Sequence, residues 1–114
     1  MPLSIKNNIS ALNALATKQA VSSNNIANVE STKFKKSTAV LEEGKNGAVA
    51  SKVQQVNTPG VMINQQDGSM TELSNVDLAQ ELTGMIPTKH SYEANLKALQ
   101  AQDEMEENTL DLIG

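Results

Sequence analysis

The C-terminal part of this chain carries apolar side chains at a regular seven-residue repeat. Steps of four and three residues alternate from Leu78 to Leu99, and one lysine interrupts the apolar series. Such a narrow stripe is typical of a coiled-coil seam, whereas a helix on a globular core has a broader apolar face. The seam residues are Leu78, Leu82, Met85, Lys89, Tyr92, Leu96 and Leu99. Because a narrow apolar edge needs a partner helix, this segment constrains the fold more than any other.

Residues 4–28 form the other helix that the sequence predicts. Apolar side chains recur along one edge of this segment at i, i+4 and i+7, which is the spacing of an amphipathic helix. They are Ile5, Ile9, Leu12, Ala16 and Ala20. This helix is weakly apolar, and short helices gain most of their stability from packing. We therefore expect a partner helix to order it, either its own C-terminal helix or one from a neighbouring copy.

The middle of the chain predicts short β structure. Residues 30–47 lack clear periodicity, and residues 48–73 look like short strands. The Thr58-Pro59-Gly60 stretch has Pro and Gly suited to the central positions of a type II turn. A second turn signal follows at Gln66-Asp67-Gly68-Ser69. One or two small hairpins are expected here, and they should lean on the helices because an isolated hairpin is at best marginally stable.

Two local signals bear on the C-terminal helix. Ser74 followed by Asp77 fits a capping box, so the helix is expected to begin at this stretch. Pro87 falls inside the helix, where it costs about 3 kcal/mol. Burial of Leu82 and Met85 offsets this, at about 1.5–3 kcal/mol for each side chain. We expect a continuous helix with a kink near Pro87, and the alternative is a break at residues 84–86.

These patterns predict a mainly α protein with a small β element. The N- and C-terminal helices should form a coiled coil or helical bundle, joined by a short β-hairpin region. The expected segments are 1–36 for the first helix and an asparagine-rich turn, 37–73 for the hairpin region, and 74–114 for the coiled-coil helix. With one Tyr, one Phe and no Trp, the chain lacks the aromatics that usually dominate core energetics. This composition favours an elongated helical assembly unit.

Charge is divided unevenly along the chain. Residues 1–57 carry seven lysines against three glutamates, a net +4, and residues 58–114 carry two lysines against ten acidic residues, a net −8. The two halves should attract each other within or between chains, which steers association more than it adds stability. The alternative is two solvated faces without specific pairing. The acidic total of −4 argues against duplex DNA, so no nucleic-acid partner is expected.

The sequence offers little for chemistry or for a membrane. The absence of cysteine excludes disulfides and thiolate metal sites. His90 is the single histidine, so it lacks the companions of a metal or catalytic site. We expect no enzyme activity, no cofactor and no metal. No apolar run approaches the ~18 residues of a membrane span, and no standard signal peptide is visible at the N-terminus.

Three stretches of the chain resemble the flagellar axial family, which includes rod and hook proteins. Ser23-Asn24-Asn25-Ile26-Ala27-Asn28-Val29, followed by Phe34-Lys35, resembles the N-terminal signature of that family. Ser74-Asn75-Val76-Asp77-Leu78-Ala79 is similar to the start of its C-terminal segment, and Ser91-Tyr92-Glu93-Ala94-Asn95, with Met85-Ile86 before it, to its helix core. The chain departs from the family at Lys33, where a glycine is frequent, and at Pro87, where a helix former is usual.

The resemblance implies a structural subunit of the bacterial flagellar basal-body rod. In that family the terminal helices pair into the inner core of a tube and become ordered on assembly. The implied partners are other copies, other rod and hook subunits, and the type III export apparatus. Export through that apparatus needs no cleaved signal peptide, and the implied location is the rod that spans the periplasm.

The predicted site is therefore a subunit interface. It comprises the first-helix edge, the asparagine motif and the apolar seam residues, namely Ile5, Ile9, Leu12, Asn24, Asn25, Ile26, Asn28, Leu78, Leu82, Met85, Tyr92, Leu96 and Leu99. The asparagines either bond between subunits or cap their own backbone. A second hypothesis is a soluble helical adaptor or export chaperone that binds a partner helix, and such a protein should stay a small oligomer at high concentration.

Overall fold

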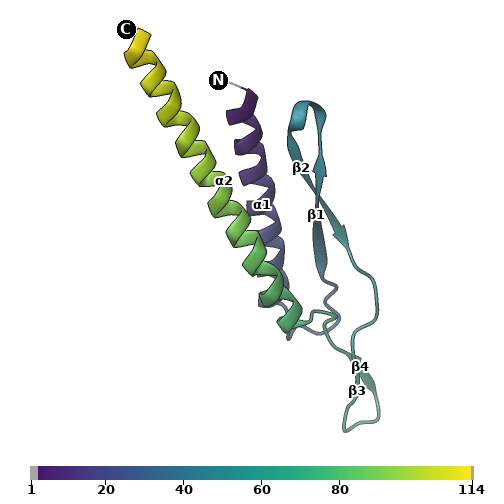
Figure 1. Ribbon diagram of the computed structural model, residues 1–114. Coiled ribbons are helices and arrows are strands. Elements are labelled where there is room, and N and C mark those ends of the chain that lie inside the picture. The colour runs from purple at the N-terminus through teal and green to yellow at the C-terminus, as the bar shows by residue number, and fades with distance from the viewer. Residues whose placement is uncertain (1–2, 114) are drawn as a thin grey trace.

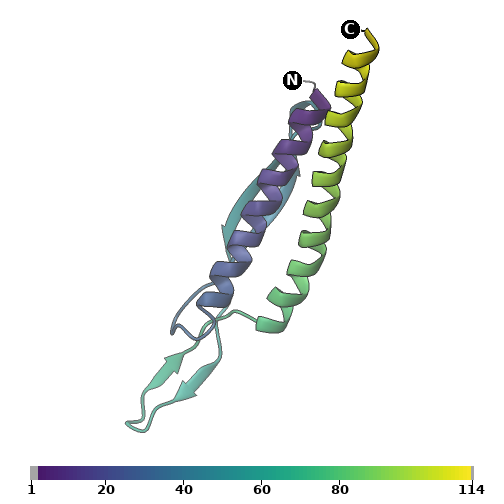
Figure 2. The same cartoon turned by 90° about the vertical axis from the view of Figure 1, so that its left-hand side faces the viewer.

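Two long helices dominate the molecule. The structure, a computed structural model, describes residues 3–113. Helix α1 (Leu3–Ala27) and helix α2 (Leu78–Ile113) lie side by side and antiparallel, so that the two ends of the chain lie at the same end of the pair (Figures 1 and 2). The molecule is elongated, with extents of 79 × 24 × 14 Å. The expected pair of helices around a small β region is confirmed, and coiled-coil geometry stays a prediction.

An antiparallel ribbon packs on α1. Strand β1 (Ser37–Glu43) pairs with strand β2 (Val49–Gln55), and a short 3-10 turn, η1 (Lys45–Gly47), connects them. Helix α1 contacts α2 and both strands, which makes it the central element of the fold (Figure 1). The buried apolar side chains are few and lie mostly on α1. They are Ile5, Leu12, Ala14, Leu15 and Ala39.

A second, smaller hairpin extends beyond the end of the helix pair (Figures 1 and 2). Strand β3 (Met62–Asn64) pairs with strand β4 (Met70–Glu72). Gly68 takes a φ of +88° in the connecting turn, a conformation that glycine adopts without steric cost. The second predicted turn is thereby confirmed.

Strand β1 lies within the aperiodic residues 30–47, in the part that overlaps the hairpin region expected at residues 37–73. The strand packs on one narrow helix, so only Ala39 becomes buried while Val40 and Leu41 stay exposed. A strand covered so incompletely does not need the alternation of apolar and polar residues that marks a half-buried strand.

The predicted type II turn at residues 58–60 is wrong. Such a turn needs a positive φ at its third residue, and Gly60 does not adopt one. The glycine is required for a different reason. A Cβ at position 60 would lie 1.9 Å from the carbonyl oxygen of Leu73, so a side chain would force two segments of the backbone apart.

The start of α2 differs from the prediction as well. Asp77, and not Ser74, caps the helix, because its Oδ1 accepts hydrogen bonds from the N–H groups of Ala79 at 3.0 Å and Gln80 at 3.3 Å. Ser74 instead bonds locally, where its Oγ accepts from the N–H of Val76 at 3.0 Å. The helix therefore begins after the segment that joins it to the β region.

Helix α2 runs without a break through Pro87. The missing proline N–H leaves the carbonyl of Thr83 without its usual helical donor. Both residues are exposed, so water can satisfy that carbonyl. The continuous helix is confirmed, and the kink near Pro87 stays a prediction.

Lys33→Gly should stabilise the fold. Lys33 has a φ of +62°, and a left-handed conformation costs a non-glycine residue on the order of 1 kcal/mol. We expect glycine to raise the free energy of unfolding by about 0.5–1 kcal/mol, measured by urea denaturation. Lys36→Gly is the control, because Lys36 lacks the positive φ and should lose stability. A Lys33→Gly chain no more stable than wild type would contradict the expectation.

Candidate subunit interface

One side of α2 faces α1, and it is not the side that the apolar repeat predicts. The side chains of α2 that are buried or half-buried are spaced by three, four or seven residues. They are Glu81, Met85, Thr88, Asn95, Leu99, Gln102 and Glu106. Only Met85 and Leu99 in this group belong to the predicted seam. The helix is therefore rotated relative to the predicted contact.

The predicted seam divides into two rows. Met85 and Leu99 pack toward α1, and Tyr92, between them in the same row, is partly exposed. The other row stays open, with Leu82 at 51% and Leu96 at 40% exposure. Glu81 and Asn95, which precede Leu82 and Leu96, face α1 instead. Because neighbouring helix residues differ by about 100°, α2 is rotated by about this angle from the predicted contact. Leu78, at the start of α2, is exposed as well.

Polar contacts near both ends of the helix pair explain this rotation. Asn25 on α1 donates to Oε1 of Glu81 at 3.1 Å. Near the other end, Asn8 donates to Oε1 of Gln102 at 3.0 Å. These bonds hold one polar row of α2 against α1, because buried polar groups need partners. The apolar row beside it is left to solvent.

Two open grooves run between α1 and α2, and Lys89, which lies between Leu82 and Leu96 in the exposed row, lines the larger one. The larger has a volume of about 530 Å³ and is lined by both helices, including Ala16 and Ala20 from α1 and Lys89 and Tyr92 from α2. The second, of about 390 Å³, is lined by Ile5, Ile9, Leu99, Gln100, Asp103 and Glu106. Most of the predicted α1 edge thus lies along these grooves, and Leu12 is buried.

Asn25 joins three elements of the fold. Its side chain is 1% exposed. Its Nδ2 donates to the carbonyl of Ser37 at 2.7 Å as well as to Glu81, and its Oδ1 accepts from the N–H of Ser37 at 3.0 Å. The amide therefore pairs with the first residue of β1 as a neighbouring strand would, while it also reaches α2.

The other residues of the asparagine motif make local contacts. Nδ2 of Asn28 donates to the carbonyl of Asn24 at 2.9 Å, which closes the end of α1. Asn24 is exposed and Ile26 is half-buried. The structure thus shows backbone capping by Asn28 and a long-range contact within the chain for Asn25. Contacts between subunits through this motif stay a prediction.

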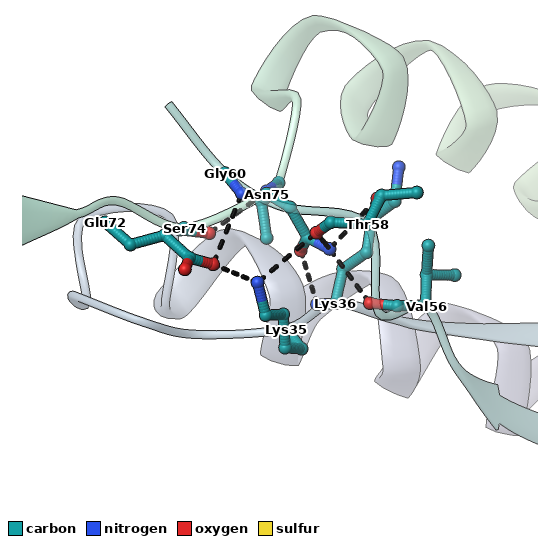
Figure 3. A network of polar contacts seen from close by, with 9 residues as sticks. Lys35, Lys36, Val56, Thr58, Gly60, Glu72, Ser74 and Asn75 are labelled. Carbon is teal, nitrogen blue, oxygen red and sulfur yellow. Dashed lines mark hydrogen bonds and ion pairs between the residues drawn. The ribbon is translucent and has the colours of Figure 1, made fainter. Parts of the chain in front are cut away.

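Asn75 holds a second junction, shown in Figure 3. Its Oδ1 accepts from the N–H of Lys36 at 2.7 Å, and its Nδ2 donates to the carbonyls of Val56 at 2.9 Å and Thr58 at 3.0 Å. One side chain therefore connects the segment before β1, the segment after β2 and the approach to α2. It fixes the ribbon to the helix pair.

An ion pair supports the same junction. Lys35 contacts Oε1 of Glu72 and also donates to the carbonyl of Thr58 at 3.3 Å. The hydrogen bond from Lys35, then that from the Gly60 N–H, and the positive charges of Lys35 and Lys33 lower the pKa of Glu72 below its usual range. Sequence reasoning missed both Glu72 and the role of Asn75, although each lies in or beside a stretch that carries the family resemblance.

In the part of the chain that the structure describes, His, Cys, Asp and Glu side chains form no cluster of three that could hold a metal. His90 is exposed on α2. No helix among residues 3–113 is both long and apolar enough to cross a bilayer.

The described chain has a pair of terminal helices, linked through Asn25 near one end and Asn8 near the other and open along one side. Comparisons with known families identify the kind of protein. Residues 67–112 match the family described as flagellar basal body rod FlgEFG protein C-terminal, and residues 5–35 match the family described as flagella basal body rod protein. The chain belongs to the flagellar basal body rod proteins. A search of curated proteins finds no significant match.

Asn25→Asp should destabilise the chain strongly. A carboxylate cannot donate to Ser37 or Glu81, and it would place a second negative charge beside Glu81. We expect a loss of about 2–4 kcal/mol in the free energy of unfolding, measured by urea denaturation followed by circular dichroism. Asn24→Asp introduces the same charge at an exposed neighbour and should change stability by less than about 0.5 kcal/mol. Equal stability of the two variants would show that the buried amide contributes little.

Glu72→Gln should make the free energy of unfolding depend less on pH in the acidic range. Because the pKa of Glu72 is lowered in the folded chain, its stabilising contribution is complete above the unfolded value of about 4.3. It is lost as the pH falls through the folded pKa. Between about pH 5 and about pH 3, the wild type should therefore lose more stability than the glutamine variant does. Urea midpoints across this range measure the difference, and parallel profiles would exclude the contribution of this carboxylate.

Proposed function

We propose that this chain is a self-assembling subunit of the flagellar basal-body rod that places helices of neighbouring copies along the grooves between α1 and α2. The observation that carries the proposal is the open row of α2. Leu82 and Leu96 recur on the heptad of the seam and remain 51% and 40% exposed. Burial of each such side chain stabilises a contact by about 1.5–3 kcal/mol when complete.

The α1 side of the grooves suits a helix as the occupant. Ala16 and Ala20 are exposed and line the larger groove. Small side chains there allow the axis of a second helix to come close, and the neighbouring Tyr92 supplies apolar area. Interdigitation of a heptad row with such a groove is the packing that coiled coils use.

A buried acceptor in the same groove also favours an occupant. Oε1 of Gln19 is buried and has no hydrogen-bond partner among the described residues. Buried polar atoms are nearly always paired in finished structures. If the Gln19 side chain turned toward the groove, a donor on an incoming helix would complete this contact and add specificity to it.

Family membership sets the context of this assembly. A rod protein is a component of the flagellar basal body and associates with other components there. We propose that the partners are further copies and other rod or hook subunits, and that the chain reaches the periplasm-spanning rod through the type III export apparatus. The role is structural and involves no nucleic acid, cofactor or membrane insertion.

Leu96→Glu should abolish side-by-side assembly and leave the monomer folded. Leu96 is exposed in the single chain, so the change should spare helix content, whereas a charge buried at the interface should weaken association by more than tenfold. Light scattering and negative-stain microscopy measure assembly, and secretion measures export, which should persist. His90→Glu is the control, because His90 is exposed about 120° around the helix from Leu96.

Two results would oppose the proposal. Normal assembly of the Leu96→Glu chain would show that the open row is not the interface. A wild-type chain that remains a small oligomer at high concentration would favour the adaptor hypothesis, since an adaptor binds a partner helix without polymerising.

A further inference from the structure

The β3–β4 hairpin presents apolar side chains on both of its faces. Met62 and Met70 lie on one face, and Val61 and Ile63 lie on the other, as the strand register requires. All four are exposed. The two strands pack chiefly on each other, and an isolated two-stranded hairpin is at best marginally stable in water. This hairpin therefore lacks a covering surface within its own chain.

The opposite end of the molecule carries a second uncovered surface. Helix α2 has 36 residues and α1 has 25, so α2 is longer by about 16 Å and extends past the start of α1 (Figures 1 and 2). All side chains from residue 107 to residue 112 are exposed. We call residues 105–112 the α2 overhang. Its exposed apolar residues are Met105, Leu110 and Leu112.

The α2 overhang is acidic, whereas the hairpin end carries charges of both signs. Five acidic side chains and no basic one lie between residues 103 and 112. At the hairpin end, the loop before β1 holds Lys33, Lys35 and Lys36 within four residues. This loop lies against β4, because the N–H of Lys33 donates to the carbonyl of Glu72 at 2.9 Å. Three of the carboxylates there are engaged locally, Glu72 by Lys35, Asp67 by Ser69 and Asp77 by the start of α2, and Glu30 in the same loop is exposed.

We propose that the β3–β4 hairpin of one copy docks on the α2 overhang of the next copy, with Lys33 and Lys36 facing its acidic residues. The two surfaces lie at opposite ends of a body 79 Å long, so one chain cannot bring them together. A contact between different patches of identical subunits is heterologous and propagates as an open chain. The inference rests on the proposed function and adds an end-to-end contact to the side-by-side contact along the grooves.

Disulfide trapping tests this contact directly, because the chain has no cysteine of its own. Chains carrying Ile63→Cys are mixed with chains carrying Leu112→Cys, and mixed dimers are measured on non-reducing gels. We expect at least fivefold more mixed dimer than from Leu112→Cys with Thr38→Cys, whose cysteine lies on the exposed outer face of β1. Equal yields from the two mixtures would overturn the proposal.

A charge swap tests the assigned partners. Lys33→Glu in the Ile63→Cys chain should lower the yield of mixed dimer at low salt, and Asp111→Lys in the Leu112→Cys chain should restore it. An unchanged yield with Lys33→Glu would remove the lysine from the contact and overturn the proposal in this form.

Repeating the trapping with Leu96→Glu in both chains separates the two contacts. Trapping that persists while side-by-side assembly is lost supports both. Loss of assembly without any specific trapping rejects the end-to-end contact alone. Specific trapping together with unimpaired assembly of the Leu96→Glu chain rejects the groove interface and leaves the end-to-end contact standing.

Discussion

The buried amide of Asn25 is the contact on which the arrangement of this molecule depends. The side chain bonds to both backbone groups of Ser37 and to Glu81, so it sets the position of the ribbon and the rotation of α2 together. An amide that is 1% exposed has no water to replace these partners, and each lost bond is therefore costly. The small apolar core alone would specify the helix pair much less well.

The fixed rotation of α2 explains why the folded chain leaves a row of apolar side chains exposed. Polar side chains such as Asn95 and Gln102 occupy the side toward α1, and the apolar row with Leu82 and Leu96 is turned outward. A single chain thus pairs its buried polar groups, apart from Oε1 of Gln19, and leaves apolar side chains exposed. This division is the reverse of that in a self-sufficient globule, and it agrees with membership in a family of rod proteins.

Periodicity predicted both helices, and turn residues predicted the turn at Gly68, because each depends on residues close in sequence. The continuity of α2 through Pro87 was predicted from the burial of Leu82 and Met85, of which Leu82 is 51% exposed. Periodicity could not show which face of α2 packs within the chain. A heptad repeat marks an apolar face of a helix, but it does not identify the partner that covers this face. Strand β1 carries no periodic signal in the sequence, because a narrow helix covers only its Ala39. The role of Asn75 could not be predicted from local sequence, because its hydrogen bonds reach residues 17 to 39 positions away.

The chain enters and leaves the β3–β4 hairpin at a single crossing. The N–H of Leu73 donates to the carbonyl of Val61 at 2.8 Å, and a Cβ on Gly60 would lie 1.9 Å from the carbonyl oxygen of Leu73. The residues between them are connected to the frame at that point and through Glu72, which bonds to Lys33 and Lys35. Inserts of quite different size could therefore replace the hairpin at this crossing without changing the spacing of the helices.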